Sequence, residues 1–246
     1  MMEIWCMTDV GLVRKENQDA YATLQHEASG HTIGVVCDGM GGAAGGQVAS
    51  RLAVDTYIRE LSSILRPDMT AEQLREASSY AVSVANKAIW DAAEASPDCR
   101  GMGTTLVSAI SYEGGVVVTN VGDSRAYHIT PAGITRVTRD HSLVERMVER
   151  GDITEEEARH HPNRNLITRA LGPDMSALSD GYIYPMESGE FLLLCSDGLV
   201  DTVTDQEMLF EVIHGGDLST CLDRLLAIAK AHGASDNVTA VLMQKR

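Results

Sequence analysis

Apolar residues in the first quarter of the chain change from a strand pattern to a helical one. Short apolar runs at 3–8, 19–25 and 31–37 are typical of β-strands, and the last is apolar enough to be buried. Residues 47–65 then repeat apolar positions at helical spacing, and Pro67 follows. The pattern predicts three strands and then a long amphipathic helix.

A second long helix is predicted at 74–95, where apolar residues again recur at helical spacing. Thr70 with Gln73 forms a capping-box pattern ahead of it. After Pro97 the pattern becomes β-rich, with turn residues between short runs. These runs predict an antiparallel meander of strands at 104–110, 114–121, 125–130 and 133–138.

The last hundred residues mix short helices with two further strands. Residues 142–151 and 155–161 predict short helices, the second opened by a capping box of Thr154 and Glu157. The following turn-rich stretch to residue 180 has the composition of a surface loop, so we expect a flap segment near 142–180. The chain then predicts a buried strand at 190–196, a helix capped by Thr204 and Glu207, a helix at 218–233 and a last strand at 237–244.

The order of these elements determines the expected fold class. Strands and helices do not alternate strictly, as they would in a parallel doubly wound sheet. Long helices interrupt the strands early and return late, which suits antiparallel sheets covered by helix pairs in an α+β layered sandwich. No internal repeat, low-complexity tract or Pro/Ser-rich linker divides the chain, so residues 1–246 are predicted to form a single domain.

Composition excludes several classes of partner. The formal net charge is −15, from 35 acidic and 20 basic residues, and such a surface repels nucleic acid and anionic membrane. The chain has neither an apolar run long enough to span a bilayer nor a basic-then-apolar leader, so we expect a cytoplasmic protein. Its five cysteines are odd in number and widely spaced, which is typical of reduced core thiols.

Aspartates recur where predicted strands end or begin. Asp38 and Asp197 each follow a predicted buried strand and precede a glycine. Asp123 also stands at the end of a predicted strand, but after a glycine, Gly122. Asp236 instead comes just before the last strand. Because the end of one antiparallel strand lies beside the start of its neighbour, these four carboxylates can converge on one rim.

Converged carboxylates repel one another unless a cation lies among them. A single Asp-Gly pair is more often an ordinary turn. Four comparable positions favour a metal site, and ligands that are all oxygen favour Mg²⁺ or Mn²⁺ over zinc. Gly39 suits the same site, because without a Cβ its carbonyl can lie close to an ion. Near the N-terminus, Arg14 stands shortly before Asp19 and could grip a phosphate through two parallel hydrogen bonds.

Together these residues resemble the metal-dependent protein serine/threonine phosphatases of the PP2C type (the PPM family), in their bacterial form. The resemblance covers nearly the whole chain. Its motifs are TDVGLVRKENQD at 8–19, VVCDGMGG at 35–42, GMGTTLV at 101–107, VGDSRAY at 121–127, TRDHSLV at 138–144, NLITRALG at 165–172, CSDGLVD at 195–201 and SDNVTAVL at 235–242.

The resemblance implies a four-layer α-β-β-α sandwich of two antiparallel sheets flanked by helix pairs, with the metals in a channel at one end. It implies that Asp38 bridges two ions, that the carbonyl of Gly39 binds one of them, and that Asp197 and Asp236 complete the shell of the other. Asp19 would act at or behind the second ion through water. Asp123, with Asp197, would hold a third and weaker ion, and Arg14 would bind the substrate phosphate.

The implied reaction is hydrolysis of phosphoserine and phosphothreonine by a hydroxide that bridges two Mn²⁺ or Mg²⁺ ions and attacks phosphorus in line. No covalent phosphoenzyme is needed. The implied partners are phosphoproteins, including a Ser/Thr kinase of the same bacterial cell, and we expect a monomer.

One position departs from many eukaryotic members, which carry a histidine after the Asp-Gly pair as the proposed general acid. Here that position is Met40, which cannot donate a proton. A metal-bound water is the first choice for the acid. His141 is the second choice, although a hydrogen-bonded structural histidine is more common, and we expect that His141 is not the acid.

Other functions fit the sequence less well. GMGGAA at 39–44 matches a dinucleotide-binding fingerprint and Glu60 lies where the ribose-binding acid would be, but this reading leaves the other aspartates unexplained. No Gly-Lys-Ser/Thr follows the glycines, and no cysteine has an arginine six residues later, so a Walker loop and a cysteine phosphatase are both excluded. A pseudophosphatase that only binds phosphoproteins is the non-enzyme alternative, and the intact set of Arg14 and metal-binding aspartates argues against it.

Overall fold

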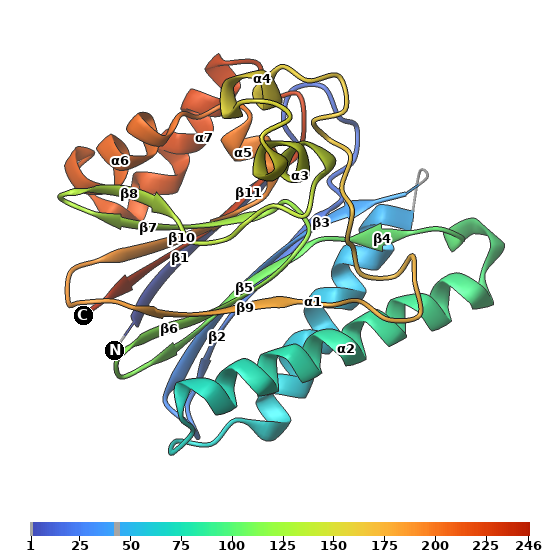
Figure 1. Cartoon of the computed structure of the whole chain (residues 1–246). Helices are drawn as coiled ribbons and strands as arrows, with labels where there is room; N and C mark the ends of the chain where they lie inside the picture. Colours follow the sequence, from blue (N-terminus) through green and yellow to red (C-terminus); the bar gives the residue numbers. More distant parts are fainter. Residues whose placement is uncertain (1, 42–44) are drawn as a thin grey trace.

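A computed structural model describes residues 2–41 and 45–246, and its strands form two sheets (Figure 1). In the first sheet the strands lie in the order β1 (Met2–Asp9), β11 (Val238–Lys245), β10 (Phe191–Cys195), β7 (Arg125–Thr130) and β8 (Gly133–Arg136). In the second the order is β2 (Asp19–His26), β3 (His31–Met40), β5 (Leu106–Tyr112), β6 (Gly115–Val121) and β9 (Asp180–Pro185), with β4 (Gly103–Thr104) paired to β3. The pairings between these strands are antiparallel throughout.

Helices cover the outer face of each sheet. The long helices α1 (Gly45–Ile64) and α2 (Ala71–Ala95) pack on the second sheet, while α5 (Asp197–Val200), α6 (Asp205–His214) and α7 (Cys221–Ala231) pack on the first. Short 3₁₀ turns, η1 (Pro97–Cys99) and η2 (Leu218–Thr220), follow α2 and precede α7. The predicted four-layer α-β-β-α sandwich is confirmed. In the described part of the chain, no helix has the length and apolar character needed to cross a bilayer.

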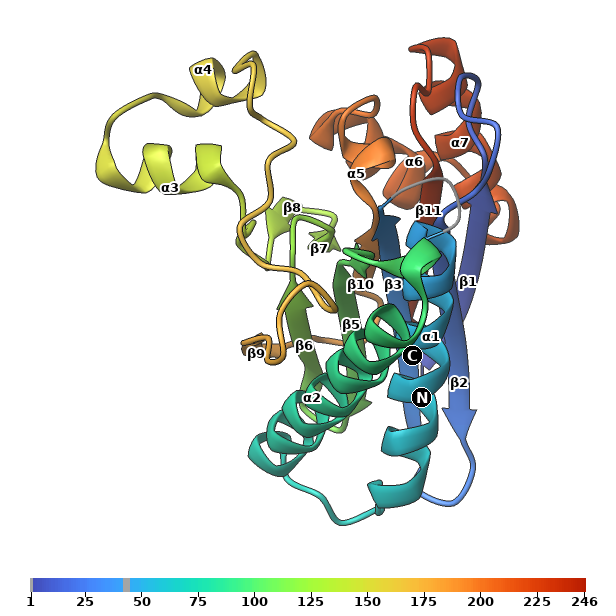
Figure 2. The same ribbon diagram turned by 90° about the vertical axis from the view of Figure 1, so that its right-hand side faces the viewer.

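The helices α3 (Leu143–Arg150) and α4 (Glu155–Arg159) stand out from these layers (Figure 2). They occupy the predicted flap segment. The capping boxes expected at Thr70, Thr154 and Thr204 are all present, and each pairs a threonine side chain with the third residue of its helix. The first residues of α2, α4 and α6 are therefore determined by the local sequence, through these capping boxes.

The space between the two sheets is filled by small and branched apolar side chains from both inner faces. The buried residues there include Val36, Val107, Val118, Leu194 and Val241. A second core lies between β3 and the helix pair α1–α2, so β3 is covered on both faces. This double burial explains why residues 31–37 are apolar without alternation.

Two expectations about the strands need correction. The predicted meander is split, because β5 and β6 belong to one sheet and β7 and β8 to the other. The chain crosses between the sheets at Gly122, whose φ of +104° places it in a conformation that favours glycine. The strand β9 is not predicted, because its Asp-Gly start and its final Pro185 read as turn signals.

Candidate metal and phosphate site

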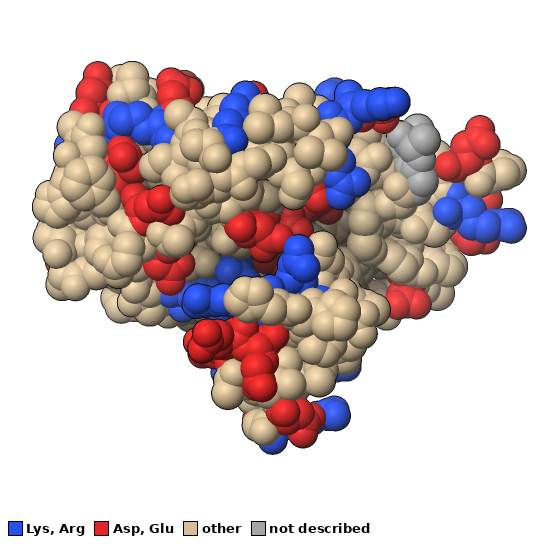
Figure 3. All heavy atoms as spheres, turned by 90° about the horizontal axis from the view of Figure 1, so that it is seen from above, with Lys and Arg blue, Asp and Glu red and all other residues tan. Residues whose placement is uncertain are grey.

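A cavity of about 600 Å³ opens at the end of the sandwich that carries the flap. Figure 3 shows this face from above, with acidic side chains in a hollow near its middle and basic side chains beside them. The structure brings six of the seven predicted site residues to the cavity wall, namely Arg14, Asp38, Gly39, Asp123, Asp197 and Asp236. The seventh, Asp19, lies behind the wall.

Asp38 lies inside β3, and not beyond its end as the sequence suggests. The strand continues because Gly39 and Met40 pair with Thr104 and Gly103 of β4. The N–H of Asp38 donates to Thr105 Oγ1 at 2.9 Å, and its carbonyl accepts from Thr104 Oγ1 at 2.8 Å. The backbone that carries this carboxylate is thus fixed on both sides.

The structure gives a packing reason for Gly39, beside the predicted approach of its carbonyl to an ion, which stays a prediction. A Cβ at this position would lie 2.1 Å from the carbonyl oxygen of Gly46 and 2.5 Å from that of Gln18. Its absence lets the start of α1 and the end of the 10–18 loop pack directly against β3. The residues Gly42, Ala43 and Ala44 of the glycine-rich pattern lie outside the described residues.

Asp197 is the first residue of α5, directly after Ser196, which precedes the helix as its N-cap. A Cβ at Gly198 would meet the carbonyl oxygen of Asn237 at 2.0 Å, so glycine is needed where α5 packs against the start of β11. Asp197 Oδ1 is buried without a hydrogen-bond partner in the described structure. Such an oxygen is costly unless something else satisfies it.

Asp236 is bound by Arg14 through an ion pair of 2.6 Å between Nη2 and Oδ2. Both side chains are open to solvent, with 56% of Arg14 and 34% of Asp236 exposed. The neighbouring Asn237 holds the loop that carries Arg14: its Oδ1 accepts from the N–H of Gln18 at 2.8 Å and its Nδ2 donates to the carbonyl of Glu16 at 3.0 Å. Residues from the two ends of the chain therefore meet at the cavity.

Asp19 is directly opposite Asp38 in the pairing of β2 with β3 and is only 7% exposed. Ser196 Oγ donates to its Oδ2 at 2.8 Å, while its Oδ1 has no partner among the described residues. Two carboxylates facing each other across adjacent strands repel when both are ionised. The pairing of Asp19 with Asp38 is therefore electrostatically unfavourable when both carboxyl groups are ionised.

The cluster raises the pKa of its carboxyl groups. Burial is the main cause, followed for Asp38 by the negative charges of neighbouring aspartates, and it lifts the pKa of Asp38 well above its usual range. Burial likewise raises the pKa of Asp123 to about 8, of Asp19 to about 7 and of Asp197 to about 6. At one edge, the hydrogen bond to Asp236 raises the pKa of Arg14, and the charge of Arg125 partly offsets the rise at Asp123.

The residues present fit hard divalent cations. Their donors are oxygens, they repel one another, and two buried carboxylate oxygens lack partners. Within residues 2–41 and 45–246, no three His, Cys, Asp or Glu side chains already stand in an arrangement that would hold an ion. One carboxylate of the set, Asp236, is paired with Arg14 instead.

Comparison with known proteins identifies the family. The sequence profile described as Protein phosphatase 2C matches residues 13–243. The chain belongs to this family. It is 36% identical over 242 residues to the serine/threonine phosphatase stp of Listeria monocytogenes. The aligned region covers 97% of this chain and 94% of that protein.

Solved structures agree with this protein phosphatase 2C assignment. The crystal structure of the serine/threonine phosphatase Stp1 from Staphylococcus aureus is 36% identical, with a TM-score of 0.92 over 100% of this chain and 96% of that one. The catalytic domain of PstP in complex with two manganese ions is 31% identical, with a TM-score of 0.82 over 99% and 97% of the two chains. The resemblance to bacterial PP2C-type enzymes, which are metal-dependent phosphoprotein phosphatases, is confirmed.

The dinucleotide-binding alternative is wrong. That fingerprint requires a parallel β-α-β unit, whereas both neighbours of β3 in its sheet, β2 and β5, run antiparallel to it. The residues that follow β3 are therefore not part of a dinucleotide-binding β-α-β unit.

Several cavity residues are not predicted from the sequence. Thr105 lines the wall beside Asp38, and its Oγ1 also lies 2.6 Å from Ser124 Oγ. Asn165 and Ile167 reach the cavity from the flap. The Thr-Thr pair in GMGTTLV offers a weak signal for Thr105. The motif NLITRALG contains Asn165 and Ile167 but does not indicate that they reach the cavity.

Met40 lines the cavity, whereas His141 does not. His141 is buried, and burial lowers its pKa, so its ring is neutral near pH 7. That His141 is not the general acid stays a prediction.

Proposed function

We propose that this protein phosphatase 2C member hydrolyses phosphoserine and phosphothreonine in proteins at a binuclear Mn²⁺ or Mg²⁺ centre. The observation that carries the proposal is the convergence of Asp38, Asp123, Asp197 and Asp236 on one cavity, with Arg14 at its opening. The chain's similarity to PstP, whose catalytic domain is known in complex with two manganese ions, supports the same choice of cofactor.

The resemblance to the family implies which residues would hold the ions. Asp38 would be shared by both ions, with the carbonyl of Gly39 on one and Asp197 and Asp236 on the other. Asp19 would act through water from behind Asp38. Asp123, with Asp197, would hold a third and weaker ion. Asp236 would have to leave Arg14 to join this set, and its partial exposure leaves it room to turn.

A pair of bound divalent ions would supply acidity to a water nucleophile near neutral pH and offset charge on the reacting phosphate. Arg14, once released by Asp236, would orient the phosphate through two parallel hydrogen bonds and add charge stabilisation. Met40 lines the cavity but cannot donate a proton. We propose that water in the cavity protonates the leaving alkoxide.

A pseudophosphatase would bind phosphoproteins without turnover. The test is hydrolysis of p-nitrophenyl phosphate and of a phosphothreonine peptide by the purified chain with Mn²⁺. We expect turnover of both, abolished by EDTA and restored by excess Mn²⁺. Absence of turnover in Mn²⁺ with retained phosphopeptide binding would establish the pseudophosphatase instead.

We also propose the setting of this activity. Its substrates would be cytoplasmic phosphoproteins, among them a Ser/Thr kinase of the same cell, and the working unit would be a monomer in which residues 1–246 form one catalytic domain. The match of the family profile to residues 13–243 supports the single domain. Phosphoproteomics of a deletion strain would reveal the substrates as sites whose phosphorylation rises.

A further inference from the structure

His141 connects the cavity wall to the flap, although it does not line the cavity. It lies just before α3 and is only 7% exposed. A polar side chain buried to this degree is expected to be hydrogen-bonded. Both ring nitrogens of His141 have hydrogen-bond partners.

The hydrogen bonds fix the roles of the two ring nitrogens. The N–H of Gly122 donates to His141 Nδ1 at 3.1 Å. A backbone N–H can only donate, so Nδ1 accepts and the ring proton lies on Nε2. Nε2 then donates to Asp180 Oδ2 at 3.2 Å. Arg169 Nη1 donates to the other oxygen of Asp180 at 2.9 Å and also lies 3.2 Å from Nε2, which cannot accept from it while it carries the ring proton.

On the cavity side, His141 holds the turn that precedes Asp123. Its own N–H donates to the carbonyl of Gly122 at 2.9 Å, so both backbone groups of Gly122 are paired with His141. A Cβ at Gly122 would lie 2.5 Å from the side chain of Thr105, which leaves the turn little room to shift. The next residue, Asp123, faces the cavity.

On the flap side, His141 holds the segment that returns to the sandwich. The N–H of Thr168 donates to the His141 carbonyl at 2.6 Å, and Ser142 forms a β-bridge with Ile167. Ile167 is one of the two flap residues on the cavity wall. One residue thus touches both the turn before Asp123 and the wall contributed by the flap.

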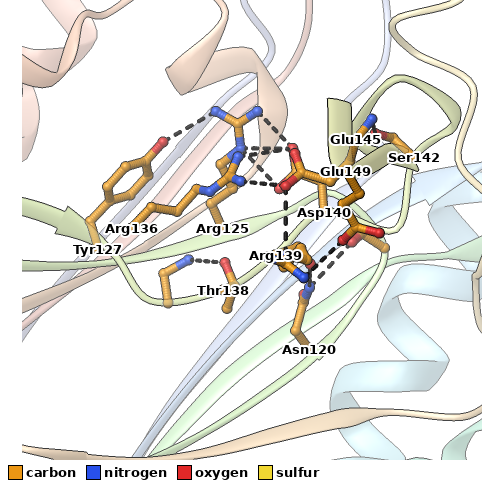
Figure 4. Close-up of polar contacts among 12 residues, drawn as sticks. Asn120, Arg125, Tyr127, Arg136, Thr138, Arg139, Asp140, Ser142, Glu145 and Glu149 are labelled. Carbon is orange, nitrogen blue, oxygen red and sulfur yellow. Dashed lines mark hydrogen bonds and ion pairs between the residues drawn. The ribbon is translucent and has the colours of Figure 1, made fainter. Parts of the chain in front are cut away.

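An ion-pair network keeps the residues beside His141 in place (Figure 4). Asp140 accepts from Arg125 Nη2 at 2.7 Å, and Arg139 Nη1 lies 2.9 Å from Glu149 at the end of α3. Asn120 Nδ2 donates to the carbonyl of Arg139 at 3.0 Å. The backbone on the N-terminal side of His141 is therefore anchored to β6, β7 and α3.

We propose that His141 is a positioning residue that couples the cavity-facing part of the flap to the turn carrying Asp123. The inference rests on the proposed function, because the coupling affects catalysis only if Asp123 helps to hold an ion. Coupling between two sites is reciprocal. An ion at Asp123 then favours the flap position seen here, and a substrate that engages the flap favours the ion.

Three substitutions separate the two sides of this link. His141→Ala removes the two side-chain hydrogen bonds, to Gly122 and to Asp180, and leaves the backbone bonds to Gly122 and Thr168. His141→Asn keeps an acceptor near the position of Nδ1 but cannot reach Asp180. Asp180→Ala removes the flap-side partner and leaves the bond to Gly122. His128→Ala is the matched control, since His128 also pairs with a carboxylate, Glu190, at 2.8 Å but does not line the cavity.

For His141→Ala we expect about a 10-fold weaker affinity for the weakest-bound Mn²⁺ in calorimetry, as for other residues that orient a metal ligand. We also expect a higher KM for a phosphothreonine peptide and faster hydrogen exchange at 165–168. His141→Asn and Asp180→Ala should keep near-wild-type Mn²⁺ affinity but share the higher KM. His128→Ala should change none of these.

Equal Mn²⁺ affinity and KM in His141→Ala and the wild type would overturn the proposal, as would loss of Mn²⁺ affinity in Asp180→Ala. The acid limb of the kcat–pH profile should persist in His141→Ala, and its disappearance would make His141 the general acid instead. If His141→Ala fails to fold, the other two variants decide. If the wild type shows no turnover with Mn²⁺, the proposed function fails, and hydrogen exchange in metal-free protein still tests the link to the flap.

Discussion

The cavity has two regions that differ in almost every physical property. Its floor, which we define as Asp38, Asp123 and Asp197, is supplied by the rigid ends of the sheets, and burial raises the pKa of each carboxyl. Its rim, defined as Arg14, Lys15, Asn165 and Ile167, comes from a loop and the flap and is largely exposed. In the proposed function, the floor would hold the cations and the rim would meet the phosphoprotein substrate.

The difference suggests a division of roles in the proposed function, with the floor residues acting in catalysis and the rim residues in substrate recognition. Carboxylates held by strand ends cannot move apart, so they repel one another until cations offset their charge. Side chains on loops adjust at little cost to the core. Changes in the floor should therefore affect turnover with every substrate, whereas changes in the rim should depend on which substrate is used.

Asp197→Ala should have the largest effect. We expect kcat to fall by at least about 1,000-fold with either p-nitrophenyl phosphate or a phosphopeptide, since charge stabilisation of the transition state is lost. The rise in Tm that Mn²⁺ gives the wild type should also disappear. Wild-type rates in this variant would refute the assignment of the floor.

Arg14→Ala should lower kcat/KM by about 100-fold, because the phosphate loses a charged, oriented donor. Arg14→Lys should recover only part of this loss, since an ammonium cannot form two parallel hydrogen bonds. Kinetics with both substrates at saturating Mn²⁺ measure the effect, so that a change in metal affinity on releasing Asp236 does not enter. Full activity in Arg14→Ala would remove arginine from phosphate binding.

Asp123→Asn should have a smaller effect, with about a 10-fold loss of affinity for the weakest ion. Asp38, Asp197 and Asp236 remain, so the main pair of ions should stay bound. Calorimetric titration with Mn²⁺ distinguishes the two outcomes. Loss of all Mn²⁺ binding would show that Asp123 belongs to the main pair.

The smallest predicted effect is on the pH dependence of stability in metal-free protein. Folding raises the pKa of Asp19 to about 7 and of Asp123 to about 8, from an unfolded value of about 4. The folded state then binds these protons more tightly, so their stabilisation is complete below about pH 4 and is lost as the pH rises to about 8.

In EDTA, Tm should therefore fall between about pH 5 and pH 8. Asp123→Asn should reduce the slope, because one of the titrating groups is gone. Mn²⁺ should oppose the fall, since it binds the ionised carboxylates. A Tm in EDTA that rises over this range would contradict the raised pKa values.

The floor and Arg14 were open to prediction, whereas the part of the rim that the flap contributes was not. Asp38 and Asp197 can be found from the sequence, because each stands directly after an apolar run typical of a buried strand and directly before a glycine. Asn165 and Ile167 have no such mark, since their place on the wall depends on contacts between 141–143 and 166–168.

The same limit explains the errors in the fold. Short β-rich runs between turn residues predict β6 and β7 as strands but not which sheet each joins, and the crossing at Gly122 decides that. The strand β9 is hidden because its side chains are only half-buried, so its composition resembles that of a loop.

The most direct test of the account is anomalous diffraction at the manganese edge from crystals soaked in Mn²⁺. It should show two strong peaks beside Asp38, one also contacting the Gly39 carbonyl and the other contacting Asp197 and Asp236. A weaker third peak should lie between Asp123 and Asp197. A cavity with no peak, or ions held by other residues while Asp236 stays on Arg14, would contradict it.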